Sequence, residues 1–126
     1  MLDKRQKKYL VDLAWHAIDK YFESENEKAI IRGLPAPQDA MFAKKGASFV
    51  TLTIRGRLRG CIGSVEAHRP LYEDVASNAI HAAFFDPRFE ALSPEELDTA
   101  NIEVSVLTEP KPLEHTGAED LLKKLR

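Results

Sequence analysis

One stretch of the chain, LRGCIG at residues 58–63, holds its only cysteine between two glycines. A cysteine reacts as its thiolate, and a nearby cation favours that form. Arg59 could supply the cation, because residues two apart point to the same face of a regular strand. Gly60 and Gly63 leave room beside Cys61 for a ligand or a second backbone segment, and a bulge at either glycine would re-aim the thiol. The stretch therefore predicts either a reactive thiol or a small cysteine that packs.

A nucleophilic thiol also needs a base, and the histidines are the candidates. His68 and His81 lie nearest to Cys61 in sequence, and His81 is near the end of a predicted helix that could pack on the strand of Cys61. A histidine without a catalytic role is the alternative for each. The chain has no His-x-x-x-His, Cys-x-x-Cys or Glu-x-x-His spacing, so we expect no metal site and no cofactor.

Two further polar groups could join this site. DPRF at residues 86–89 reads as a loop that ends a helix, and an Asx turn explains its first two residues. Arg88 is not needed for that turn, and its planar guanidinium could bind an anion beside Asp86. Glu103 and Ser105 lie on the polar face of a predicted strand. That face either meets solvent or lines a pocket with the cysteine.

Periodicity predicts the elements that must position these residues. Apolar residues at helical spacing predict a helix over residues 3–23, and strict alternation predicts a strand over 48–55 that returns through LRGCIG as a hairpin. The pattern then predicts the following elements: a helix over 71–85, a short helix over 94–98, a strand over 101–108 and a last helix from 118. This order favours an α+β domain, with helices packed on a mixed or antiparallel sheet.

Composition narrows the function classes. The chain has 126 residues, a formal net charge of −2 and 44% hydrophobic residues, which suits one globular domain. No basic excess points to nucleic acid, and no stretch approaches the roughly 20 apolar residues of a membrane helix. The N-terminus lacks the long apolar region of a signal peptide, so we expect a cytoplasmic protein. One cysteine cannot form an internal disulfide.

Three motifs in order carry a family resemblance: LRGCIG, then DPRFEALSPEEL, then IEVSVLTEP. With them, residues 5–112 or so resemble the AMMECR-one domain family, whose prokaryotic members are called AmmeMemoRadiSam system protein A. The resemblance implies an α+β fold with a mixed sheet and a smaller lobe, and a biochemical function that is not settled. It also implies Memo-type and radical-SAM proteins as partners, because they are often encoded with or fused to the family. The implied functional surface surrounds the LRGCIG strand and carries over to residues 58–63, 86–89 and 103–105.

One departure from the family affects the expected domain. Family members continue past the point where this chain stops, so we expect residues 1–126 to form a single domain that lacks C-terminal strands. Two functions stay open. The chain is either an enzyme component that uses Cys61 on a carbonyl or other small-molecule substrate, with Arg59 or Arg88 holding an anionic group, or a binding and scaffold module without catalysis.

Overall fold

The structure, a computed structural model, describes residues 2–107. Its elements in chain order are α1 (Lys4–Ser24), α2 (Glu27–Arg32), η1 (Ala40–Ala43), β1 (Lys45–Ile54), β2 (Arg57–Gly63), β3 (Arg69–Pro70), α3 (Leu71–Phe84), η2 (Pro94–Thr99) and β4 (Ala100–Leu107). Strand β1 is central and pairs with β2, β3 and β4, each time antiparallel. The predicted α+β class is therefore confirmed, with an antiparallel sheet. The predicted last helix lies outside the described residues.

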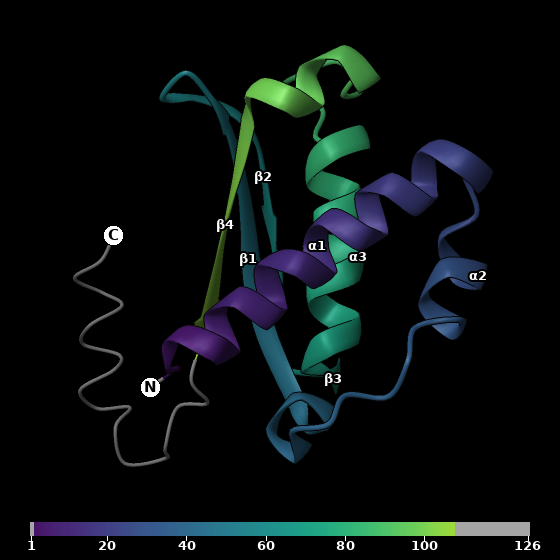
Figure 1. The fold of residues 1–126 in the computed structure, drawn as a ribbon, viewed down its shortest axis with the longest axis vertical. Coiled ribbons are helices and arrows are strands. Elements are labelled where there is room, and N and C mark those ends of the chain that lie inside the picture. The colour runs from purple at the N-terminus through teal and green to yellow at the C-terminus, as the bar shows by residue number, and fades with distance from the viewer. Residues whose placement is uncertain (1, 108–126) are drawn as a thin grey trace.

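Helices α1 and α3 cover one side of the sheet (Figure 1). Helix α3 contacts β1 and β2, while α1 crosses α3 and reaches β4. The core between these layers is apolar and fully shielded from solvent, and it includes Leu10, Ile18, Val50, Leu52, Val75 and Ile80. The predicted apolar stripe of the first helix is the face that packs, because its buried residues are Leu10, Leu13, Ala14, Ala17 and Ile18.

Local capping explains where the first two helices begin and end. Asp3 accepts a hydrogen bond from the Gln6 backbone N–H at 2.8 Å, and the Gln6 side chain accepts one from the Asp3 N–H at 2.9 Å. The chain leaves α1 at Glu25, whose φ of 53° is left-handed. Asn26 then caps α2 by accepting from the Ala29 N–H at 3.1 Å. The sequence pattern predicts no helix between residues 23 and 48, so α2 was missed.

The hairpin of β1 and β2 sets the direction of the side chains on either side of Cys61 in the LRGCIG strand. Its two-residue turn has positive φ at Arg55 (53°) and Gly56 (78°), which is the type I′ geometry that matches strand twist. The register then pairs Leu52 with Gly60 but Thr53 with Leu58. Arg59 is therefore the extra residue of a β-bulge, directly before Gly60.

No helix in the part of the chain that the structure describes is both long enough and apolar enough to cross a membrane.

Candidate functional site around Cys61

Cys61 lies on the sheet face that points away from α1 and α3. It pairs with Thr51 of β1, and Thr51 in turn pairs with Glu103 of β4, so the three residues form one row across the sheet. The Thr51 Oγ1 and Cys61 Sγ atoms are 3.3 Å apart, a hydrogen bond in which either group can donate. Two strand spacings separate Cys61 from Glu103, about 10 Å. Cys61 and Glu103 therefore lie on one face of the sheet, a placement that the sequence pattern left open.

We call this face of the sheet the open face. It carries the outward-pointing residues of three strands: Phe49, Thr51 and Thr53 of β1, Cys61 and Gly63 of β2, and Asn101, Glu103 and Ser105 of β4. Its β1 and β2 members are half-buried, whereas its three β4 members are exposed. Most of these side chains are small and uncharged. The predicted site residue Ser105 therefore shares the open face with Cys61, one row along, opposite Phe49.

The space beside the two glycines of the motif is filled by other residues of the same chain. A Cβ atom on Gly60 would lie 2.1 Å from the carbonyl oxygen of Ala82, so the missing side chain lets the backbone of α3 approach β2. A Cβ atom on Gly63 would lie 2.3 Å from the ring of Phe49, which covers this glycine on the open face. Of the two readings that the sequence left open, close packing explains the space at both positions.

Arg59 does not pair with the thiol. Its guanidinium binds the Glu96 carboxylate through two nitrogens, each 3.0 Å from an oxygen. It also donates to the backbone carbonyl of Glu90 at 2.8 Å. The expectation that Arg59 and Cys61 share a face assumed a regular strand, and the bulge at Arg59 breaks that alternation. The bonds from Arg59 hold the pKa of the Glu96 carboxyl below its usual range, and the same carboxylate accepts the backbone N–H of Ser93 at 2.9 Å.

The DPRF loop contacts the outer edge of β2. Asp86 is only 4% exposed, and its Oδ2 accepts the backbone N–H of Cys61 at 3.0 Å. The Arg88 guanidinium donates two hydrogen bonds to the same carboxylate, from Nε to Oδ1 at 3.0 Å and from Nη2 to Oδ2 at 2.8 Å. These bonds, above all those from the Arg88 side chain, hold the pKa of Asp86 far below its usual range. The planar fork that could have bound an external anion is thus occupied by Asp86.

Arg88 nevertheless lies near the thiol. Its pKa is raised above the ordinary value, chiefly by the bonds to Asp86 and in smaller part by the proximity of Cys61. The ring of Phe89 lies between two cations, with the guanidinium carbon of Arg59 at 5.9 Å and that of Arg88 at 5.4 Å from its centroid. Both arginines therefore lie beside the Phe89 ring.

His81 is not placed to serve Cys61 as a base. Its Nε2 is 2.7 Å from Oε1 of Glu27 on α2, on the side of the sheet that the helices cover. Between residues 2 and 107, the one hydrogen-bond partner of the Cys61 side chain is Thr51. In the same part of the chain, no three His, Cys, Asp or Glu side chains gather as metal ligands would.

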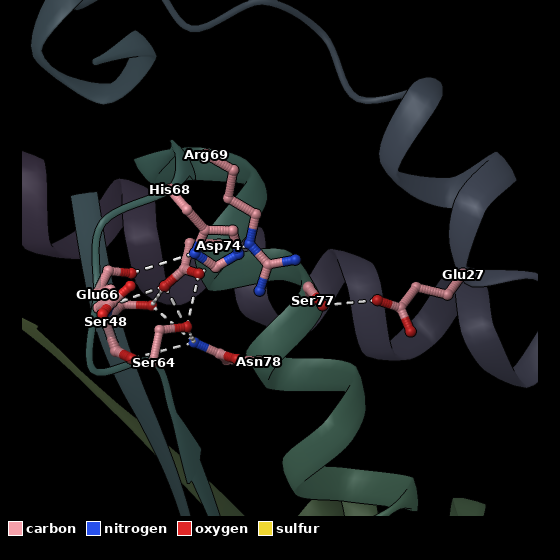
Figure 2. A network of polar contacts seen from close by, with 9 residues as sticks. All are labelled: Glu27, Ser48, Ser64, Glu66, His68, Arg69, Asp74, Ser77 and Asn78. Atoms are coloured by element: carbon pink, nitrogen blue, oxygen red, sulfur yellow. Dashed lines mark hydrogen bonds and ion pairs between the residues drawn. The ribbon is translucent and has the colours of Figure 1, made fainter. Parts of the chain in front are cut away.

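Sequence reasoning missed a second polar cluster, between α3 and β1. Asp74 is completely buried and accepts four side-chain or backbone donors at 2.8 Å: Ser48 N, Ser48 Oγ, Ser64 Oγ and Arg69 Nε. Asn78 joins this cluster from the next turn of α3 (Figure 2). Polar residues three and four positions apart in LYEDVASNAI were the available signal, since they put Asp74, Ser77 and Asn78 on one side of the helix.

These elements define an α+β domain in which helices cover one face of an antiparallel sheet. The AMMECR1 family model matches residues 11–125, so the chain belongs to the AMMECR1 family. A protein of Methanothermobacter thermautotrophicus is 38% identical over 125 residues, covering 99% of this chain and 63% of that protein. A protein of Thermofilum pendens is 38% identical over 129 residues, covering 93% of this chain and 58% of that protein.

A solved structure shares the fold. The crystal structure of the uncharacterized protein PH0010 from Pyrococcus horikoshii aligns with a TM-score of 0.75 and 34% identity, covering 87% of this chain and 55% of that one. The chain therefore spans between about half and two thirds of the length of these relatives.

Proposed function

We propose that this domain is a binding module whose open face receives a segment of a protein partner. One observation carries the proposal: the two arginines and the histidine that sequence reasoning assigned to a catalytic site are used in internal contacts. Arg59 is bound to Glu96, and Arg88 is bound to Asp86. His81 is bound to Glu27. Among residues 2–107, the thiol thus keeps a threonine hydroxyl as its neighbour and contacts no base, which a nucleophile requires.

The chemistry of the open face suits a protein segment. Its threonines and Cys61 present a pleated surface of small side chains, over which another backbone can pass closely. Phe49 and the 44% exposed Leu58, which pairs with Thr53, add apolar area. Glu103 is the one carboxylate among the residues that define the face. Family resemblance suggests the partner, a Memo-type protein, with a radical-SAM protein as a further component.

The proposal is tested by the affinity of this chain for the Memo-type protein of the same organism, measured by calorimetry. Thr51→Arg puts a long charged side chain at the centre of the open face, and it should weaken binding about tenfold or more. Thr99→Arg makes the same change on η2, outside the sheet, and should leave the affinity unchanged. Equal affinities for the two variants, or no complex with the unaltered chain, would overturn the proposal.

A second candidate is an enzyme component in which Cys61 adds to a carbonyl carbon. The sulfur–carbon bond forms as the carbonyl π bond breaks, and the thiol proton ends on the carbonyl oxygen to give a thiohemiacetal. The observation that favours it is position: the half-buried thiol lies on the open face with Glu103 in the same row, and Asp86 links the Cys61 N–H to Arg88.

Alkylation by iodoacetamide separates the two candidates, because Cys61 is the only cysteine and all label reports on it. A binding module predicts slower labelling in the folded chain than in urea, since folding half-buries the thiol against Thr51. Faster labelling of the folded chain would mean that the surroundings activate the thiol, and would favour the enzyme.

A further inference from the structure

A polar pocket of about 670 Å³ lies on the helix side of the molecule, away from the open face. Residues from the end of α1, from α2 and from α3 line it, together with Arg69: Ser24, Glu25, Asn26, Glu27, Lys28, Arg69, Ser77, Asn78 and His81. Every one of these side chains is polar or charged. Such a lining favours a small, strongly hydrated ligand over an apolar one.

Arg69 provides the cationic part of this pocket. Its Nε donates to the fully buried Asp74 at 2.8 Å, which fixes the plane of the guanidinium. Figure 2 shows the outer edge of that group turned from Asp74 toward the side where Ser77 lies. Among residues 2–107, no acceptor binds its Nη1 or Nη2. A planar fork held in this way matches the two oxygens of a carboxylate.

Glu27 provides the anionic part. The Ser77 hydroxyl donates to its Oε2 at 2.6 Å, and His81 Nε2 lies 2.7 Å from its Oε1 (Figure 2 draws the contact with Ser77). These contacts hold the carboxylate, whose side chain stays 29% exposed, against α3. Each carboxylate oxygen can accept more than one hydrogen bond, so Glu27 can still accept from a ligand ammonium.

Asn78 is a buried polar group with unused capacity. It is 4% exposed, and its Nδ2 lies 3.0–3.2 Å from four acceptors of the Asp74 cluster: Ser48 O, Ser48 Oγ, Ser64 Oγ and Asp74 Oδ2. Its Oδ1 receives no donor from the described part of the chain, and Figure 2 shows it pointing away from that cluster. Buried amide oxygens are normally hydrogen-bonded, so this acceptor on the pocket wall requires a donor.

We propose that the pocket binds a small zwitterion of the α-amino acid type. The ligand carboxylate meets the free edge of Arg69, and the ligand ammonium donates to Glu27 and to Asn78 Oδ1. The lining suits a ligand with one positive and one negative charge, because it contains two basic residues, Lys28 and Arg69, and two acidic residues, Glu25 and Glu27. A simple anion would meet the Glu27 carboxylate, and a simple cation would meet Arg69. The site is independent of the proposed binding at the open face.

The test is an NMR titration of the 126-residue chain that follows the backbone amides of Arg69, Ser77, Asn78 and His81. The probes are free L-α-amino acids, with acetate and ethylamine as ligands that carry one charge each, and inorganic phosphate. At least one amino acid should shift these amides saturably. It should bind about tenfold or more tightly than acetate, ethylamine or phosphate, because each of those probes loses a charge-assisted contact.

Two variants localise the effect. Glu27→Gln keeps the shape of the side chain but removes its charge, and it should weaken amino acid binding about tenfold. Glu23→Gln removes the same charge from the exposed end of α1, outside the pocket, and should change nothing. The amide spectrum also reports whether each variant is folded. The proposal is overturned if no amino acid shifts the pocket amides, if a singly charged probe binds as well, or if Glu27→Gln binds like the unaltered chain.

Discussion

At the scale of single residues, the glycines of LRGCIG are explained by what touches them. Gly60 is buried where the carbonyl of Ala82 approaches β2, and Gly63 lies under the ring of Phe49. Both positions were noticed in the sequence because glycine is unusual inside a strand. The sequence could not say whether a ligand or the protein fills the space, since Ala82 and Phe49 are brought there only by tertiary packing.

Gly60→Ala should be strongly destabilising, by about 3 kcal/mol or more, because the new methyl group collides with backbone that cannot rotate away. Gly56→Ala is the matched control. Its Cβ meets nothing within 4 Å, and it carries only the strain of a φ of 78°, about 1–2 kcal/mol. Urea unfolding measures both free energies. Equal losses would show that α3 does not press on β2 at Gly60.

Asp86→Asn should lower the free energy of unfolding by about 1–3 kcal/mol at neutral pH, since the amide cannot satisfy both Arg88 and the Cys61 N–H. The pKa of Asp86 is lowered in the folded state, so its contribution is complete above the unfolded pKa of about 4 and is lost as pH falls through the folded pKa.

Urea unfolding of both chains across pH checks this sign. The gap between the original chain and Asp86→Asn should be constant above about pH 5 and should narrow at lower pH, as the original carboxylate is protonated. A gap that widens as pH falls would contradict the assigned state of Asp86.

At the scale of elements, periodicity predicted the two long helices and the three longer strands, because burial of one face imposes the period of 3.6 or 2. The same alternation put Glu103 and Ser105 on the polar face of their strand, and only the strand pairing shows that Cys61 shares this face. It failed at Arg59, since a bulge depends on pairing with another strand and leaves no periodic mark. It missed α2, whose single buried residue, Ile30, makes no stripe.

Arg59 links β2 to η2 through its two hydrogen bonds to Glu96. We expect the strength of this link to depend on the forked geometry of the guanidinium. Arg59→Lys keeps the charge but loses the paired bonds to Glu96 and the bond to the Glu90 carbonyl. We expect a loss of about 1–3 kcal/mol in unfolding free energy and faster amide exchange in β2. Arg57→Lys, at an exposed position of the same strand, is the control and should cost less than about 0.5 kcal/mol. Equal exchange rates in the two variants would contradict the link.

At the scale of the whole molecule, the two candidate sites lie on opposite sides of the sheet. The open face carries the thiol, while the pocket beside Arg69 lies under the helices. Sequence reasoning joined His81 to Cys61 because His81 lies near the end of a predicted helix that could pack on the strand of Cys61. In the fold His81 belongs to the pocket instead, since α3 directs it toward Glu27. Helical spacing put Asp74 and Asn78 on one side of α3, but it could not supply the partners of Asp74 on β1, because Ser48 and Asp74 are 26 positions apart.

The central claim is that the open face binds its partner through the shape of the surface and does not need the thiol. The most direct test is the dissociation constant of the Cys61→Ser variant with the Memo-type protein. Serine preserves the size of the side chain and can keep the hydrogen bond to Thr51. We predict an affinity within about threefold of the unaltered chain, a difference of roughly 0.7 kcal/mol. Loss of the complex, with the amide spectrum still that of a folded chain, would show that partner binding requires the sulfur and would contradict the proposed function.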